Sequence, residues 1–203
     1  MDYNKIAKLL LQINAIKLEP KNPFTWSSGK KSPIYCDNRL TLSYPKIRKI
    51  IQEQLITLAK KDFKKMDLIA GVATAGIPHG VLMANNMNLP FIYVRSTEKK
   101  HGRQNKIEGE IGGNKKVLIV EDLISTGKSS LNVAESLIEV GCEIVGIISI
   151  FNYNFLETKK RLKMKKIKHS SLCDFEVLIK QAEKEKYISE KELNEIYTWH
   201  SNF

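Results

Sequence analysis

Residues 45–151 alternate between helical and strand patterns, and this alternation restricts the fold more than any other feature of the sequence. Short apolar segments predict four strands, at residues 67–72, 89–94, 116–121 and 143–151. Helical periodicity fills the intervals at residues 45–61, 75–87 and 127–140. Strands this apolar, separated by helices, indicate a parallel sheet covered on both faces. We therefore expect an α/β fold with a central parallel sheet flanked by helices.

Both ends of the sequence are expected to be helical. Apolar residues recur at helical spacing over residues 6–13, which is unlike the unbroken apolar run of a signal peptide. Further helices are predicted over residues 174–186 and 189–199. The longest apolar stretch, residues 144–151, is too short to span a bilayer. The three cysteines include no Cys-x-x-Cys pair and suit a reducing cytosol, so we expect a cytoplasmic protein without a membrane partner.

Composition sets the size class and leaves the role of the charge open. A chain of 203 residues fits one domain. The formal net charge is +11, and much of it lies in residues 157–168. Nucleic-acid binding, attraction of small polyanions and a solvated lysine-rich surface all agree with this charge. No aromatic residues interleave with the basic run, and no nucleic-acid-binding motif is visible. The solvated surface is the favoured interpretation, and a nucleic-acid partner is not expected.

The segment after the strand at 116–121 combines features that suit a sugar phosphate. The strand delivers two adjacent carboxylates, Glu121 and Asp122, to the edge of the sheet. A Ser-Thr-Gly turn at residues 125–127 follows, and a helix then begins. Backbone N–H groups of such a turn, together with the positive end of the helix, favour a bound phosphate. Carboxylates beside a phosphate site suit a ligand with vicinal hydroxyls, such as a ribose phosphate.

Two other interpretations of this segment are weaker. Gly127, Lys128 and Ser129 resemble the end of a P-loop, but that motif needs a glycine where this sequence has Asp122. A carboxylate at that place would repel a triphosphate. An acidic strand end followed by a capped helix would explain a single Ser or Thr in the turn. It would not explain two acids followed by a six-residue segment that can surround an anion.

The segment resembles the PRPP-binding signature of the type I phosphoribosyltransferases, in which a hydrophobic strand precedes Glu/Asp-Asp, two hydrophobic residues and Thr/Ser-Thr-Gly. The resemblance implies the type I phosphoribosyltransferase fold with a small N-terminal hood. It also implies that Glu121 and Asp122 bind the ribose hydroxyls, Asp122 with a catalytic role, and that residues 125–129 bind the 5′-phosphate. The PRPP contacts implied in this segment are Glu121, Asp122, Leu123, Ile124, Ser125, Thr126, Gly127, Lys128 and Ser129.

The polar stretch at residues 95–113 is long for a compact α/β domain, and loops of this length are commonly lids. Its Arg95, Lys99 and His101-Gly102 resemble the lid of the orotate phosphoribosyltransferase family, although Ser96 stands where that family often has Lys. The resemblance implies that Arg95, Lys99 and His101 bind PRPP, with Lys99 and His101 catalytic. It also implies a homodimer in which each lid closes over the neighbouring subunit's site.

A strand-to-helix turn of small residues lies where that family binds pyrophosphate. The residues concerned are Val72, Ala73, Thr74 and Ala75. Small side chains let backbone N–H groups approach an anion, although such a turn is also ordinary packing. His79, a few residues further on, is interpreted as structural.

Residues 24–35 resemble the family's F-T-x-x-S-G-x-x-S-P-x-Y stretch, which implies a hood of about residues 1–40 over the base, within one domain spanning residues 1–203. One branch of the family has Lys at the place of Ser27 and an orotate-contacting Arg at that of Tyr153, so this sequence follows another branch. The predicted orotate contacts are Ser125, Tyr153 and Arg39. A structural ion pair is an equal alternative for Arg39.

The resemblance implies transfer of the 5-phosphoribosyl group from PRPP to orotate, giving orotidine 5′-monophosphate and pyrophosphate in pyrimidine (UMP) biosynthesis. The expected cofactor is Mg²⁺, held mainly by PRPP and water, so no metal ligand is firmly assigned. Two alternatives remain, a phosphoribosyltransferase for another base and a PRPP-sensing nucleic-acid-binding regulator of the same fold. The hood segment argues against a purine acceptor, and the intact lid argues for catalysis.

Overall fold

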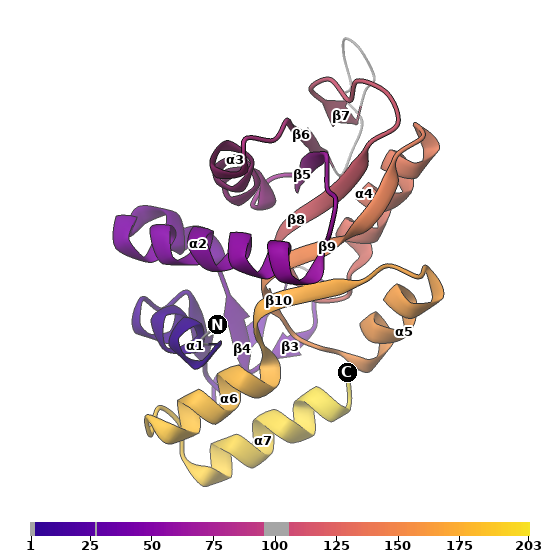
Figure 1. The fold of residues 1–203 in the computed structure, drawn as a ribbon. Coiled ribbons are helices and arrows are strands. Elements are labelled where there is room, and N and C mark those ends of the chain that lie inside the picture. The colour runs from indigo at the N-terminus through magenta and orange to yellow at the C-terminus, as the bar shows by residue number, and fades with distance from the viewer. Residues whose placement is uncertain (1–2, 27, 96–105) are drawn as a thin grey trace.

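The computed structural model describes residues 3–26, 28–95 and 106–203, and its centre is a six-stranded sheet (Figure 1). The strand order is β10-β9-β8-β5-β6-β7. The bounds are β5 Leu68–Val72, β6 Phe91–Val94, β7 Ile107–Glu108, β8 Lys116–Ile124, β9 Glu143–Asn152 and β10 His169–Asp174. All neighbours pair in parallel except β6 and β7. The predicted α/β fold with a central parallel sheet is therefore confirmed.

Helices cover both faces of the sheet because its central strands are apolar on both sides. Alternate residues of β8 show this, since Leu118 and Val120 join one buried cluster while Val117 and Ile119 join the other. The first cluster includes residues of α1 (Tyr3–Gln12), α2 (Pro45–Asp62) and α3 (Gly76–Met87). The second includes residues of α4 (Lys128–Glu139) and α5 (Leu156–Met164).

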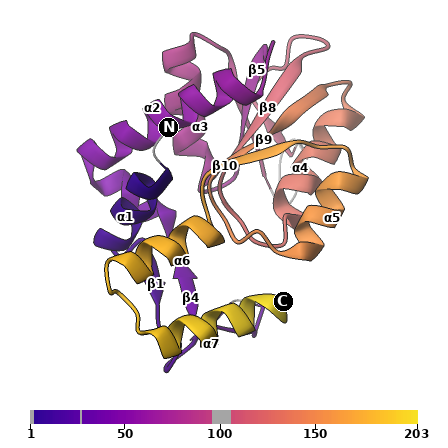
Figure 2. The ribbon, with the colours of Figure 1, turned by 60° about the horizontal axis from the view of Figure 1, so that its bottom comes forward.

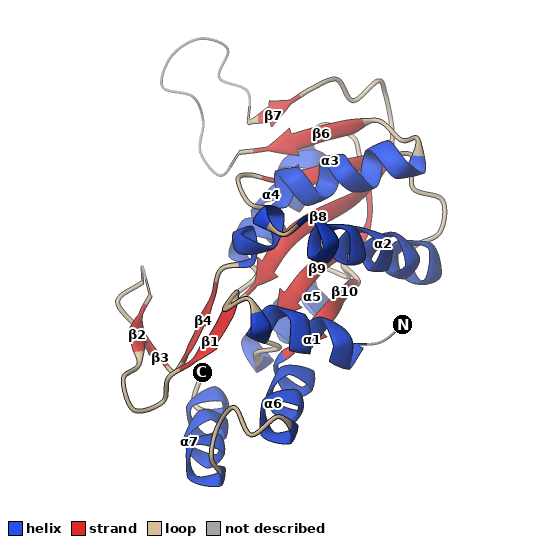
Figure 3. Ribbon diagram, turned by 90° about the vertical axis from the view of Figure 1, so that its left-hand side faces the viewer, coloured by secondary structure: helices blue, strands red, loops and turns tan. Residues whose placement is uncertain are grey.

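The N-terminal region adds two small antiparallel pairs beside the sheet (Figure 3). Strands β1 (Ile16–Leu18) and β4 (Ile34–Cys36) form one pair, and β2 (Phe24–Thr25) and β3 (Lys31–Ser32) form the other. The 3-10 helix η1 (Asn38–Ser43) then leads into α2. Helices α6 (Phe175–Lys184) and α7 (Glu190–Ser201) pack near the same region, with α6 against α1 (Figure 2). This region is thus continuous with the main core.

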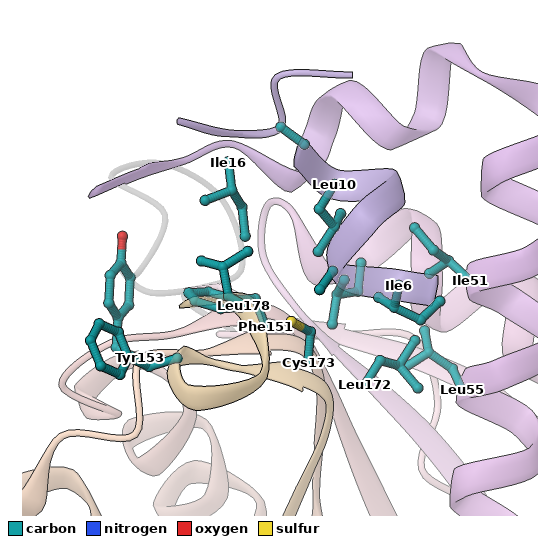
Figure 4. Packing of buried hydrophobic residues seen from close by; sticks show 14 of the residues in the cluster. Ile6, Leu10, Ile16, Ile51, Leu55, Phe151, Tyr153, Leu172, Cys173 and Leu178 are labelled. Atoms are coloured by element: carbon teal, nitrogen blue, oxygen red, sulfur yellow. The ribbon is translucent and has the colours of Figure 1, made fainter. Parts of the chain in front are cut away.

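Side chains from distant parts of the sequence meet in that core (Figure 4). Ile6 and Leu10 of α1 lie close to Ile51 of α2 and to Leu172 and Cys173 of β10. All five are essentially inaccessible to solvent. The cluster joins the N-terminal helix to the edge of the sheet.

The end of α7 closes onto the β2–β3 hairpin through polar and aromatic contacts. The indole Nε1 of Trp199 donates to the Lys31 carbonyl at 3.0 Å, and Nε2 of His200 lies 2.7 Å from the Tyr153 carbonyl oxygen. The ring of Phe203 stacks on Phe155 with centroids 4.1 Å apart. These contacts hold the hairpin in place relative to the sheet.

Several elements differ from the sequence prediction, which included none of the short strands β1–β4 and β7. Strand β8 continues to Ile124, three residues beyond the predicted end, because its pairing with β9 runs on to Asn152. Strand β10 was not predicted, since its His-Ser-Ser start carries little apolar signal. Helix α5 was not predicted, because it lies within the basic run and its only buried residues are Thr158 and Leu162. Within the described residues, no helix has the length and apolar character needed to cross a membrane.

Candidate active site

The turn after β5 lies directly against the acidic end of β8. Gly76, the first residue of α3, packs so closely that an added Cβ would overlap the carbonyl oxygen of Val120 and lie 3.3 Å from the Cα of Glu121. The small-residue turn at 72–75 leads into this contact, with Thr74 exposed. Two segments that the sequence marked for anion and ribose binding therefore meet at one edge of the sheet, as the carboxyl ends of parallel strands do.

Glu121, which is buried, and Asp122, which is half-buried, form a carboxyl pair. Glu121 is 6% exposed, and its two carboxylate oxygens accept hydrogen bonds from the Asp122 backbone N–H (3.1 Å) and from Ser130 Oγ (3.3 Å). Burial raises the pKa of Glu121, and the negative charge of Asp122 raises it further. Burial also raises the pKa of Asp122. Both carboxyl groups are therefore harder to ionise than ordinary ones, and their oxygens can accept hydrogen bonds from a diol.

The turn between β8 and α4 has the form of an anion cradle. Gly127 has φ of +72°, in the left-handed region that favours glycine, and the helix begins at the next residue, Lys128. Thr126, the residue before this glycine, is exposed. Ile124 is buried in the second hydrophobic cluster, whereas Leu123 packs against the first and is only partly buried.

A cavity of about 280 Å³ lies beside this turn and brings cationic groups together. Arg95, Lys128 and Ser129 line it, as does Lys106, which the sequence reasoning missed. Lys106 is brought there by the antiparallel pairing of β6 and β7, in which the Arg95 N–H donates to the Lys106 carbonyl at 2.8 Å. Arg95 also lies 3.7 Å from Glu108.

The remaining lid predictions fall outside the described residues. Lys99, His101 and Gly102 belong to the segment 96–105, for which the structure gives no placement. Their predicted contacts with PRPP stay predictions.

Arg39 forms an ion pair with Asp37, as its alternative interpretation predicted. Its Nε and Nη2 donate to the two carboxylate oxygens of Asp37 at 2.6 and 2.8 Å. The hydrogen bond from Arg39 lowers the pKa of Asp37. The guanidinium is nevertheless exposed, so its predicted contact with orotate stays a prediction.

Tyr153 occupies a different environment from the one expected of it. The side chain is 1% exposed, its ring stacks on Phe155 at 5.2 Å, and Trp26 packs edge-on against it at 5.2 Å. The structure thus places Tyr153 in the aromatic core, which corrects the expectation of a ring bordering an open site. Cys36, half-buried nearby, is a free thiol whose pKa is raised by burial.

Two buried side chains that the sequence did not single out bind the backbone of the acidic strand and turn. Asn38 Nδ2 donates to the Asp122 carbonyl, and Thr158 Oγ1 donates to the Ser125 carbonyl, each at 2.7 Å. They lie 84 and 33 residues from their partners in the sequence. No local pattern signals a contact over such separations.

An acidic strand end, an anion cradle and a small-residue turn on one edge of a parallel sheet define a phosphoribosyltransferase. Residues 41–190 match the family model described as "Phosphoribosyl transferase domain", and the chain belongs to that family. Among curated proteins, the orotate phosphoribosyltransferases of Bacillus cytotoxicus and of Bacillus cereus (strain B4264) are each 48% identical to it, over 98% of this chain and 94% of theirs. Within the family, it therefore belongs with the orotate phosphoribosyltransferases.

Solved structures share the fold. The Leishmania donovani UMP synthase superposes with a TM-score of 0.84 at 26% identity, covering all of this chain and 43% of that one. This chain thus spans less than half of the UMP synthase. The orotate phosphoribosyltransferase from Aeropyrum pernix superposes with a TM-score of 0.78 at 24% identity, over 91% of this chain and 99% of that one.

Proposed function

We propose that this protein transfers the 5-phosphoribosyl group of PRPP to N1 of orotate, giving orotidine 5′-monophosphate and pyrophosphate in pyrimidine biosynthesis. The observation that carries the proposal is the close contact of Gly76, which directly follows the small-residue turn at 72–75, with the acidic end of β8. The 48% identity to curated orotate phosphoribosyltransferases over nearly the whole chain supports orotate as the acceptor.

Different residues of the site bind the ribose, the 5′-phosphate and the pyrophosphate of PRPP. Glu121 and Asp122 accept hydrogen bonds from the ribose hydroxyls, and the turn at 125–127 with the start of α4 binds the 5′-phosphate. The C1–O bond to pyrophosphate breaks as N1 of orotate bonds to C1, through an oxocarbenium-like transition state. The proton on N1 of orotate passes to the leaving pyrophosphate or to water as the N1–C1 bond forms, so no strong base on the protein is needed. Arg95, Lys99 and His101 neutralise the leaving pyrophosphate.

Mg²⁺ is the proposed cofactor, and the residues present fit it. Glu121 and Asp122 offer the hard oxygen donors that this ion prefers. Most of its ligands would come from PRPP and water, with at most one or two from these carboxylates. When bound, the ion supplies positive charge to the pyrophosphate oxygens.

The proposal also includes the arrangement that the family resemblance implies. Residues 1–40 form a hood over the base within a single domain. Two chains form a homodimer in the cytoplasm, and the lid of each closes over the other's site. The basic residues of α5 are solvated.

The fall in orotate absorbance, with PRPP and Mg²⁺ present, tests the activity. We expect turnover that needs all three components and drops steeply in Lys99→Ala, because the leaving group loses a cation. Lys60→Ala is the matched control, since Lys60 is exposed on α2 and lies outside the proposed site.

No orotate consumption by the folded protein would refute the proposal. Turnover of hypoxanthine or adenine would then indicate a different base. Salt-dependent nucleic-acid binding without turnover would indicate a regulator.

A further inference from the structure

Thr158 braces the proposed phosphate turn from its buried side. It is the third residue of α5 and is 2% exposed. Its Oγ1 donates to the Ser125 carbonyl at 2.7 Å, and its Cγ2 lies 3.1 Å from where a Cβ on Gly127 would be. One side chain therefore contacts the residues on both sides of Thr126.

The hydrogen bond from Thr158 sets the direction of a backbone N–H group. The peptide joining Ser125 to Thr126 is trans, so its C=O and N–H point in opposite directions. Holding the Ser125 carbonyl against buried Thr158 turns the N–H of Thr126 away from the core. Thr126 is exposed, which agrees with an N–H directed to the side from which an anion would approach.

The neighbouring carbonyl shows why the side chain at position 158 matters. The carbonyl of Ile124 accepts a hydrogen bond from the backbone N–H of Tyr153 at 2.9 Å, which almost any residue at that position could supply. The Ser125 carbonyl instead depends on a hydroxyl. A residue without one would leave this carbonyl unpaired and the peptide free to rotate.

We propose that Thr158 is a positioning residue for the 5′-phosphate of PRPP, acting through the Ser125–Thr126 peptide. The inference rests on the proposed function. Because Thr158 is buried beneath the turn, it acts on the backbone and does not touch the substrate. Its effect is therefore confined to ligands that carry the 5′-phosphate.

Thr158→Val tests the proposal, because valine keeps the shape of the side chain and removes only the donor. We expect the KM for PRPP to rise roughly 5- to 150-fold, the range for an unpaired buried acceptor, with the KM for orotate unchanged. Inhibition by ribose 5-phosphate should weaken by the same factor, while inhibition by pyrophosphate should not change. Thr158→Ser should restore the wild-type constants.

Thr57→Val is the matched control, since Thr57 Oγ1 also donates to a backbone carbonyl, that of Glu53 at 2.8 Å, but on the exposed face of α2. Circular dichroism checks folding, and Thr158→Ala replaces the valine variant should that fail to fold. An unchanged KM for PRPP, or equal weakening of ribose 5-phosphate and pyrophosphate, would overturn the proposal. Should the wild type not turn over orotate, calorimetry with ribose 5-phosphate still compares wild type and variants.

Discussion

The side-chain amide of Asn38 donates a hydrogen bond to the backbone carbonyl of Asp122 at 2.7 Å, although 84 residues separate them in the sequence. Asn38 is fully buried at the start of η1. Strand β5 pairs with β8 only as far as Val120, so Asn38 supplies a donor to the part of β8 that β5 does not reach. The N-terminal region is thereby attached to the acidic end of the strand.

Replacing Asn38 should destabilise the fold more than replacing an exposed asparagine in a similar bond. Asn38→Ala leaves the Asp122 carbonyl unpaired, so we expect the free energy of unfolding to fall by about 1–3 kcal/mol. Asn86→Ala is the control, because Asn86 donates to the Leu82 carbonyl at an exposed site. Urea denaturation measures both, and equal losses would contradict the importance of the buried bond.

Glu121 should make the ligand-free protein less stable as the pH rises. Its folded pKa is raised above the ordinary value of 4.5, so its contribution to stability is complete below pH 4.5 and is lost as the pH rises through the folded pKa. Glu121→Gln should remove this loss, and the exposed Glu143→Gln should not. Thermal unfolding across the acidic to neutral range checks this, and identical pH profiles for wild type and Glu121→Gln would count against it.

His79 should make the fold sensitive to acid. It is 2% exposed on α3, and burial lowers its pKa from 6.5 to about 4. The unfolded state therefore binds the proton first, and the stability supplied by neutral His79 falls as the pH drops from 6.5 towards 4. Between pH 7 and 4.5 this loss is about 2 kcal/mol, and His79→Leu should abolish it. Urea denaturation at the two pH values measures the difference, which should be the same in both proteins if His79 has no part in it.

Gly76 should not tolerate a side chain. Gly76→Ala forces a Cβ into the backbone of Val120, so we expect loss of stability together with a fall in activity, because the acidic pair must move. Gly80→Ala on the same helix is the control, since its Cβ would overlap the side chain of Phe91 and would lie at an ordinary 3.5 Å from the nearest backbone atom, the Cα of Gly71. Wild-type stability and turnover in Gly76→Ala would show that the contact is not tight.

Mixing two inactive variants should restore activity if the lid serves the neighbouring subunit. Lys99→Ala removes a lid group and Asp122→Asn alters the ribose site, so a mixed dimer keeps one site with both groups intact. Co-purified mixtures, assayed beside each variant alone, test this. Mixtures as inactive as the separate variants would place the lid over its own subunit's site.

The sequence predicts the strands and helices whose apolar pattern is strong, and it misses those stabilised by neighbours. Strand β10 has few apolar residues, yet it forms because β9 pairs with it. The site follows the same division. The acids and the turn at 121–127 are contiguous and could be found, whereas Asn38, Thr158 and Lys106 reach the site only through the tertiary fold. Arg39 was open to two interpretations because its partner Asp37 is equally visible in the sequence.

The contacts between α7 and the β2–β3 hairpin set an order of events during synthesis. The hairpin leaves the ribosome early, but the groups that hold it, Trp199 and Phe203, are added about 170 residues later. At the usual rate of elongation, this is a wait of roughly 10 to 30 seconds. During that interval Trp26, whose partners include both late residues, lacks part of its aromatic packing. A nascent chain stalled before α7 would therefore display an unfinished N-terminal region, which is a natural target for chaperones.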